Sequence, residues 1–203
     1  MKNIVNRRQT GASLIMVMII LTIVSMLGVA AIQISIMSER GARNDRDYQI
    51  AWQAAEEALI DAEYDISGPG VSARRSIFSP TPNISAFIDG CGSAGDTVGL
   101  CAGTFLAGTK PSWIAVDFTT TGTNAATTQF GTFTGRTFAS GNGGFQSAKP
   151  PRYVIEAIED NGGRGAQQRN KSVPQAAYVY RVTAMGFGPR GSTQAVMQTI
   201  YRD

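Results

Sequence analysis

A long uncharged segment near the amino terminus limits what this chain can fold into. Residues 12–37 contain no Asp, Glu, Lys or Arg. A bilayer core of ~30 Å needs ~20 apolar residues in a helix, so the segment is long enough to cross a membrane with some tilt. It is too long for the apolar part of a secretory signal, about 7–15 residues, and no small-x-small cleavage site follows it closely. We therefore expect a single membrane-spanning helix.

The charges beside this segment set its orientation. Residues 1–11 hold Lys2, Arg7 and Arg8 and no acidic residue, in a chain with 18 basic and 15 acidic residues. The positive-inside rule keeps this basic leader in the cytoplasm and places the carboxyl-terminal bulk across the membrane. Without the leader the chain is formally neutral, so its charge does not indicate a nucleic-acid partner.

Residues 38–65 continue the apolar segment as an amphipathic helix. Small apolar side chains recur there at helical spacing, namely Ala51, Ala54, Ala55, Ala58, Leu59 and Ala62. Acidic side chains lie between them, namely Glu56, Glu57, Asp61 and Glu63. Gly68-Pro69-Gly70 ends the pattern, which gives one helix ~80 Å long. Its alanine stripe predicts close packing against another surface, and we expect Trp52 in the same interface.

Several classes of enzyme are excluded by composition. The chain contains no His, which rules out Ser-His-Asp and Cys-His catalysis, His-ligated zinc and a histidine pH switch within it. It has no P-loop and no dinucleotide-binding G-x-G-x-x-G after a strand. The segment nearest to G-x-S-x-G, residues 91–95, has Cys in place of the first Gly. We expect no catalytic site, cofactor or metal.

Two cysteines lie in the head, which we expect to comprise residues 66–203. Cys91 and Cys101 have nine residues between them and are the only cysteines of the chain. Outside the cytoplasm such a pair is expected to form a disulfide, whereas two thiolates without histidine make an incomplete zinc site. Asp89 and Asp96 flank this loop and could contact a cation such as calcium, but a solvated pair is the simpler expectation.

Strand patterns concentrate near the carboxyl terminus. Residues 152–159, 177–184 and 193–201 are short runs rich in strand-forming residues. Residues 186–192 contain three Gly and one Pro, which predicts a hairpin between the last two strands. A sheet with one apolar face needs a cover, and the alanine stripe supplies it. Trp113 is expected in a further strand.

The segment 119–151 is less clear. Phe130, Phe133 and Phe138 alternate with Thr and Gly, a pattern that fits an edge hairpin or a mobile loop. Buried aromatics would belong to the core, and exposed ones would mark a contact surface for another subunit or an adhesion ligand. We expect core or subunit contact, because the segment lacks the basic and aromatic density of a nucleic-acid groove.

Three stretches carry a resemblance to a known family. Residues 7–15, RRQTGASLI, resemble the prepilin leader of type IV pilins. Residues 38–59, with AWQAAEEAL at their end, are similar to the amino-terminal region of PilX-type minor pilins. Residues 180–188 and 195–199 resemble the final hairpin of that family. The resemblance implies an α+β pilin fold, with a long amino-terminal helix packed on an antiparallel β-sheet head.

The resemblance also implies how the chain is processed and where it goes. A prepilin peptidase would cut between Gly11 and Ala12 and methylate the new amino terminus of Ala12. The subunit would then wait in the inner membrane with its head in the periplasm, and join an extracellular fibre with the major pilin and other minor pilins. A tip adhesin is a further possible partner.

One position departs from the family pattern. Major pilins usually carry Glu at the fifth mature position, where this chain has Met16. A carboxylate in apolar surroundings is costly unless paired, and in pilins the resemblance implies a pair with the amino terminus of a neighbouring subunit. A subunit with nothing above it needs no such pair, and K-type pseudopilins of type II secretion are similar in this respect. We interpret Met16 as the mark of a tip-proximal subunit that initiates assembly; neutral substitution within an apolar run is the alternative.

Two other functions stay open at the sequence level. The chain could be a minor pseudopilin of a type II secretion system, or a membrane-anchored adhesion or sensor domain that never enters a filament.

Overall fold

A computed structural model describes most of the chain, namely residues 12–68, 74–79, 81–103, 110–140, 145–160 and 178–202. Helix α1, Ala12–Ser67, is 56 residues long and uninterrupted. The chain divides into two compact units, one ending at Asp45 and one beginning at Arg46, so α1 contributes to both.

The first unit consists of the amino-terminal part of α1. Its side chains are exposed from Ser13 to Asp45. An 18-residue window of this helix has a mean hydropathy of 2.8, and within the described ranges it is the one helix long and apolar enough to cross a membrane. A helix that is apolar all round needs lipid or other helices about it, because water does not solvate such a surface.

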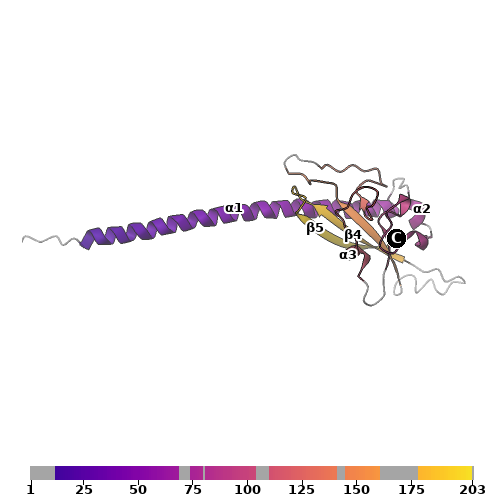
Figure 1. The fold of residues 1–203 in the computed structure, drawn as a ribbon, viewed down its shortest axis with the longest axis horizontal. Helices are drawn as coiled ribbons and strands as arrows, with labels where there is room; N and C mark the ends of the chain where they lie inside the picture. The colour runs from indigo at the N-terminus through magenta and orange to yellow at the C-terminus, as the bar shows by residue number, and fades with distance from the viewer. Residues whose placement is uncertain are drawn as a thin grey trace, which may run out of the picture. The chain divides into compact units, whose positions relative to one another are not determined.

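The second unit is a mixed sheet with part of α1 against one face (Figure 1). Its strands are β1 (Leu100–Ala102), β2 (Thr128–Gln129), β3 (Arg152–Glu159), β4 (Tyr178–Phe187) and β5 (Gln194–Tyr201). The order is β1-β3-β4-β5, and β2 pairs with β3. In the described parts of the connections lie four short helices: α2 (Arg75–Phe78), η1 (Ile84–Ala86), η2 (Gly95–Thr97) and α3 (Ser112–Ala115).

The sheet confirms the three predicted strands and corrects one expectation. Strands β3, β4 and β5 form an antiparallel meander. Strand β1, however, runs parallel to β3, with Leu100 opposite Ile155, so the sheet is not wholly antiparallel. The β4–β5 turn is closed by two backbone hydrogen bonds, between the N–H of Gly188 and the carbonyl of Thr193 (2.8 Å) and between the N–H of Thr193 and the carbonyl of Arg190 (2.9 Å).

The predicted alanine stripe forms the contact between α1 and the sheet. The five alanines are buried, namely Ala51, Ala54, Ala55, Ala58 and Ala62. Gly186 of β4 lies so close to α1 that an added Cβ would collide with the carbonyl oxygen of Ala51 and the backbone nitrogen of Ala55. Small side chains on both elements therefore let their backbones approach directly, and α1 can lie flat on the sheet.

Both tryptophan expectations are wrong. Trp52 is 41% exposed and lies on the flank of α1 beside the alanine stripe, where its indole N–H donates to the carboxylate of Glu56 at 3.2 Å. Its helical position, beside the buried Ala51 but turned by ~100°, places it outside the interface. Trp113 belongs to helix α3 and not to a strand; it is half-buried against the outer face of the sheet, next to Val154.

We predict that Gly186→Ala destabilises the head. The new methyl group meets helix backbone, which cannot rotate away, so the free energy of unfolding should fall by roughly 1–3 kcal/mol, the usual cost of overpacking. Urea denaturation of the full-length protein in detergent, followed by near-ultraviolet circular dichroism, measures the change. Gly191→Ala is the matched control, because there the nearest atom lies 3.5 Å from the added Cβ, an ordinary contact. Equal stability of the two variants would contradict this account of the helix–sheet contact.

Candidate functional site: the assembly helix and its attachment to the head

The amino-terminal positions singled out by the sequence lie at the start of α1. Gly11 lies outside the described residues, and α1 begins at Ala12. Met16 is 69% exposed on the apolar part of the helix, among exposed Ile, Leu and Val side chains. Cleavage between Gly11 and Ala12, methylation of Ala12 and the role of Met16 stay predictions.

A buried ion pair attaches the end of α1 to the head. The side chains of Asp65 and Arg74 are both fully buried. The Nε and Nη2 of Arg74 donate to the two carboxylate oxygens of Asp65 at 2.5–3.1 Å, and the hydroxyl of Tyr153 donates to the same carboxylate at 2.9 Å. Burial, together with the charge of Asp65, raises the pKa of Tyr153 well above 10, so this phenol stays protonated and remains a donor. The fork geometry of arginine suits this bidentate contact.

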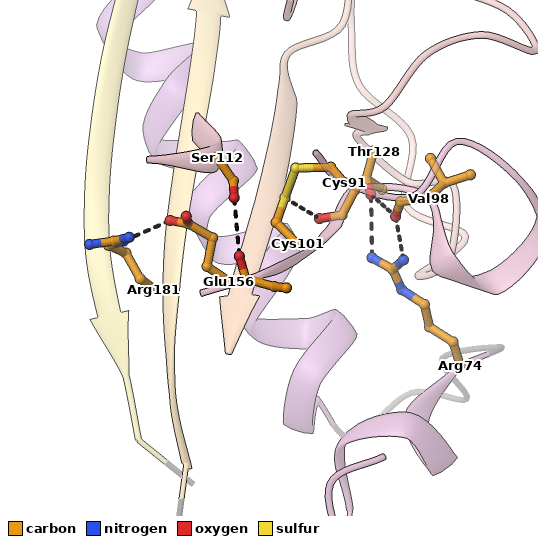
Figure 2. Close-up of a disulfide and its surroundings, with 10 residues drawn as sticks. Arg74, Cys91, Val98, Cys101, Ser112, Thr128, Glu156 and Arg181 are labelled. Atoms are coloured by element: carbon orange, nitrogen blue, oxygen red, sulfur yellow. Dashed lines mark hydrogen bonds and ion pairs between the residues drawn. A yellow bond between two sulfur atoms is a disulfide. The ribbon is translucent and has the colours of Figure 1, made fainter. Parts of the chain in front are cut away.

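The same guanidinium holds the disulfide loop (Figure 2). Cys91 and Cys101 form a disulfide, with 4.1 Å between their Cα atoms. Nη1 of Arg74 donates to the carbonyl oxygens of Val98 (2.6 Å) and Asp96 (3.1 Å), which lie inside the closed loop. One arginine thus connects α1 to the disulfide loop.

Aromatic rings complete the environment of Arg74. Its guanidinium carbon lies 3.8 Å from the ring centre of Phe133 and 5.9 Å from that of Phe78. Such contacts favour a cation in a dry site, because the ring faces are negative. The phenylalanine-rich segment therefore serves the core at this point: Phe130 is buried, and its ring lies 5.3 Å from that of Phe138. In the described part of the segment we find no hairpin, only the two-residue strand β2.

A second acid of α1 is buried as well. Asp61 accepts hydrogen bonds from the backbone N–H of Gly131 (2.8 Å) and the hydroxyl of Thr134 (2.5 Å). Arg136 lies 3.5 Å from it. Desolvation nonetheless raises the pKa of Asp61 above its ordinary 3.8, and the nearby charge of Asp65 adds to that effect. Asp61 therefore attaches α1 to residues 131–136 at some cost in desolvation.

The outer face of the sheet carries a third pair. Glu156 of β3 is fully buried, and the Nε of Arg181 on β4 donates to its Oε2 at 2.7 Å (Figure 2). The Ser112 hydroxyl, at the start of α3, donates to the carbonyl of Ala102 and ties this helix to β1.

The cation suggested by Asp89 and Asp96 finds no support in the described part of the chain. Both side chains are exposed. In the ranges that the structure describes, no group of three or more His, Cys, Asp or Glu residues could hold a metal ion.

Sequence reasoning missed the buried charges of α1. The helical pattern places Asp61 only among the acids between the alanines, and it singles out neither Asp65 nor Arg74. A signal was present: Asp61 and Asp65 stand three residues from Ala58 and Ala62 respectively, on the same helical face. An acid within a buried stripe indicates a buried partner.

The architecture defines the class of protein. A long amino-terminal apolar helix, continuing into a segment packed on a sheet-containing head, is the α+β fold of pilins. Two family models match the chain: PilX N-terminal over residues 10–59, and type IV pilus assembly protein PilX C-term over residues 41–203. The chain belongs to the type IV pilus assembly protein PilX family, whose members act as minor pilins in pilus assembly. Searches of the curated proteins and of the solved structures gave no match.

We predict a large stability loss for Asp65→Asn. The change leaves the guanidinium of Arg74 buried without its counter-ion, which typically costs about 3–5 kcal/mol. Arg202→Gln is the control, since Arg202 is 56% exposed and its pair with Asp160 spans 3.3 Å at the surface; such pairs contribute at most about 1 kcal/mol. Urea denaturation of both full-length variants in detergent gives the comparison. A loss no larger for Asp65→Asn than for Arg202→Gln would show that the buried pair is not the attachment we describe.

Asp61 should make head stability depend on pH. An acid whose pKa is higher in the folded than in the unfolded chain holds its proton longer when folded, so stability falls as the pH rises from about 3.8 through the raised pKa. Asp61→Asn removes this dependence, and its stability relative to the natural protein should improve as the pH rises through that window.

The control for this experiment has the opposite sign. Hydrogen bonds from Thr119 and Thr120 lower the pKa of the exposed Asp117. Its carboxylate therefore stabilises the head above pH 3.8, and this contribution is lost as the pH falls. The stability of Asp61→Asn and of Asp117→Asn, each relative to the natural protein, should change with pH in opposite directions between pH 3 and pH 7, and parallel changes would contradict the assignment.

Proposed function

We propose that this protein is a minor pilin that prepilin peptidase cuts between Gly11 and Ala12, and that helps to initiate type IV pilus assembly at or near the filament tip. The observation that carries the proposal is the continuity of α1. One unbroken helix joins an exposed apolar segment to a segment fixed in the head. Lipid covers the apolar segment before assembly, and the helices of other pilins cover it afterwards. Both environments are apolar, so the same helix surface is stable in each.

The position near the tip rests on Met16. An apolar residue there avoids the desolvation cost of an unpaired carboxylate. Met16 cannot form an ion pair with the amino terminus of a subunit above it. This loss weakens assembly within the fibre but has no effect at its end, where no subunit lies above. The partners in this proposal are the major pilin, other minor pilins and a tip adhesin. The head faces the periplasm before the subunit enters the extracellular fibre.

Two alternatives share the long helix. A minor pseudopilin of type II secretion would be processed in the same way but would not occur in pili. An anchored adhesion or sensor domain would keep residues 1–11 and stay in the membrane.

The test combines the state of the amino terminus with location. Mass spectrometry of the protein isolated from sheared pili should find chains that begin with N-methylated Ala12, and Gly11→Arg should prevent this cleavage. Gold labelling of the head should mark fibre ends, and deletion of the gene should reduce the number of pili. An intact leader contradicts the pilin proposal, even labelling along the shaft contradicts the tip position, and absence from pili favours the secretion alternative.

A further inference from the structure

A groove runs between the carboxyl-terminal turns of α1 and the edge strand β5. Two adjoining hollows, of about 150 Å³ and 390 Å³, share Ile60 and Glu63. The smaller extends over the sheet, and the larger extends along the helix to Gly68. We call this the α1–β5 groove, lined by Ile60, Glu63, Tyr64, Ser67, Val182 and Tyr201.

The groove offers an exposed apolar surface. Ile60 is 45% exposed and Tyr64 is 41% exposed, on the side of α1 away from the alanine stripe. At its far side the hydroxyls of Ser67 and Tyr201 hydrogen-bond to each other at 2.5 Å, which fixes the wall between helix and strand. The groove therefore presents adjacent apolar side chains with a fixed position.

The side of the groove that α1 contributes is acidic. Residues 47–67 contain no Lys or Arg, and Glu56, Glu57 and Glu63 are exposed there. Two arginines from other segments border the groove, but both are engaged there: the guanidinium of Arg136 lies 5.0 Å from the ring centre of Tyr64 and pairs with Asp61, and Nη1 of Arg75 donates to the carbonyl of Gly68 at 2.7 Å. Across the part of the chain that the structure describes, Glu63 forms no ion pair and accepts no hydrogen bond. It is the carboxylate common to both hollows, so an occupant of the groove lies against it.

These features define the chemistry of an occupant. A wholly apolar segment would desolvate Glu63 without a partner, which is costly, and an acidic segment would be repelled. A basic side chain can lay its methylene stem on Ile60 and Tyr64 while its charge meets Glu63. A groove parallel to a helix fits an amphipathic helix, which presents residues on one face at intervals of three and four.

We propose that the α1–β5 groove binds a helix of another pilin subunit that carries an exposed Arg or Lys between apolar residues. The basic side chain pairs with Glu63, and the apolar residues cover Ile60 and Tyr64. The inference rests on the proposed function, to which it adds the place and the chemistry of one subunit contact.

Crosslinking in the native membrane tests the contact. A photoreactive phenylalanine analogue replaces Ile60 in the full-length protein, and Ile114 is the matched control, since it is 50% exposed on α3. We expect a crosslink from position 60, and none from position 114, to a helical segment of another pilin with a basic residue within one turn of the linked residue. A crosslink to lipid alone, to a second copy of this chain or to a non-helical segment, or no crosslink, overturns the proposal.

Charge variants test the role of Glu63. Glu63→Gln should lower the crosslink yield at position 60 by about two- to fivefold, the range of one exposed ion pair, and Glu63→Arg by more. Asp89→Arg, a reversal at another exposed acid of the head, should leave the yield unchanged. Combining Glu63→Arg with a change of the partner's basic residue to Glu restores an opposite-charge pair, so the crosslink yield should return. An unchanged yield with Glu63→Arg contradicts the proposal, and equal protein levels with a closed disulfide confirm that the variants fold.

The outcome separates this inference from the proposed function. If Ala12 is N-methylated and deletion of the gene removes pili, but position 60 gives no crosslink to a pilin helix, only the groove assignment fails. If residues 1–11 are retained, the proposed function fails whatever position 60 contacts.

Discussion

The direct contact between the backbones of α1 and β4 is the constraint on which the head depends. Gly186 has no side chain and faces Ala51 and Ala55, so the sheet lies against the helix at a distance that a larger residue would not permit. Small residues add little apolar area each, but they let neighbouring groups pack at the density of a protein interior. The large core side chains, such as Tyr153 and Tyr180, gather beyond this contact, toward the end of α1.

Alanine packing alone would leave the position of α1 weakly specified, because one alanine can replace another after a shift of one turn. The buried carboxylates of Asp65 and Asp61 remove that ambiguity. Each has partners at defined places: Arg74 and Tyr153 for Asp65, and Gly131 and Thr134 for Asp61. A shifted helix would leave these carboxylates buried and unpaired, so the polar contacts select one register even where their net contribution to stability is small.

The sequence predicted the elements whose signals are local. The alanine stripe, the three strands and the hairpin after β4 all follow from periodicity and turn composition, as does the helix end at Ser67 next to Gly68. The parallel strand β1 could not be foreseen, because three residues carry no periodicity and their pairing with β3 spans about fifty residues of chain. The burial of Arg74 could not be predicted either, because the sequence does not distinguish a buried arginine from an exposed one until the position of its partner is known. Trp52 lies outside the interface because it is turned by ~100° about the helix axis from Ala51.

Along α1 the charges are segregated, and this bears on how the subunit makes contacts. Residues 12–37 have none, and residues 47–67 have acidic residues only. If position 16 held an acid, its ion pair would lie in apolar surroundings. Removing both charged partners from water is costly there, and neither charge is tolerated without the other. A pair at Glu63 lies at the surface, where either partner can stay solvated alone. If both proposals hold, this subunit lacks the ion pair at position 16 within the apolar helix bundle but forms an ion pair through Glu63 on the surface of the head. Such an arrangement suits a subunit that begins a fibre, because it must be stable in the membrane before any neighbour has arrived.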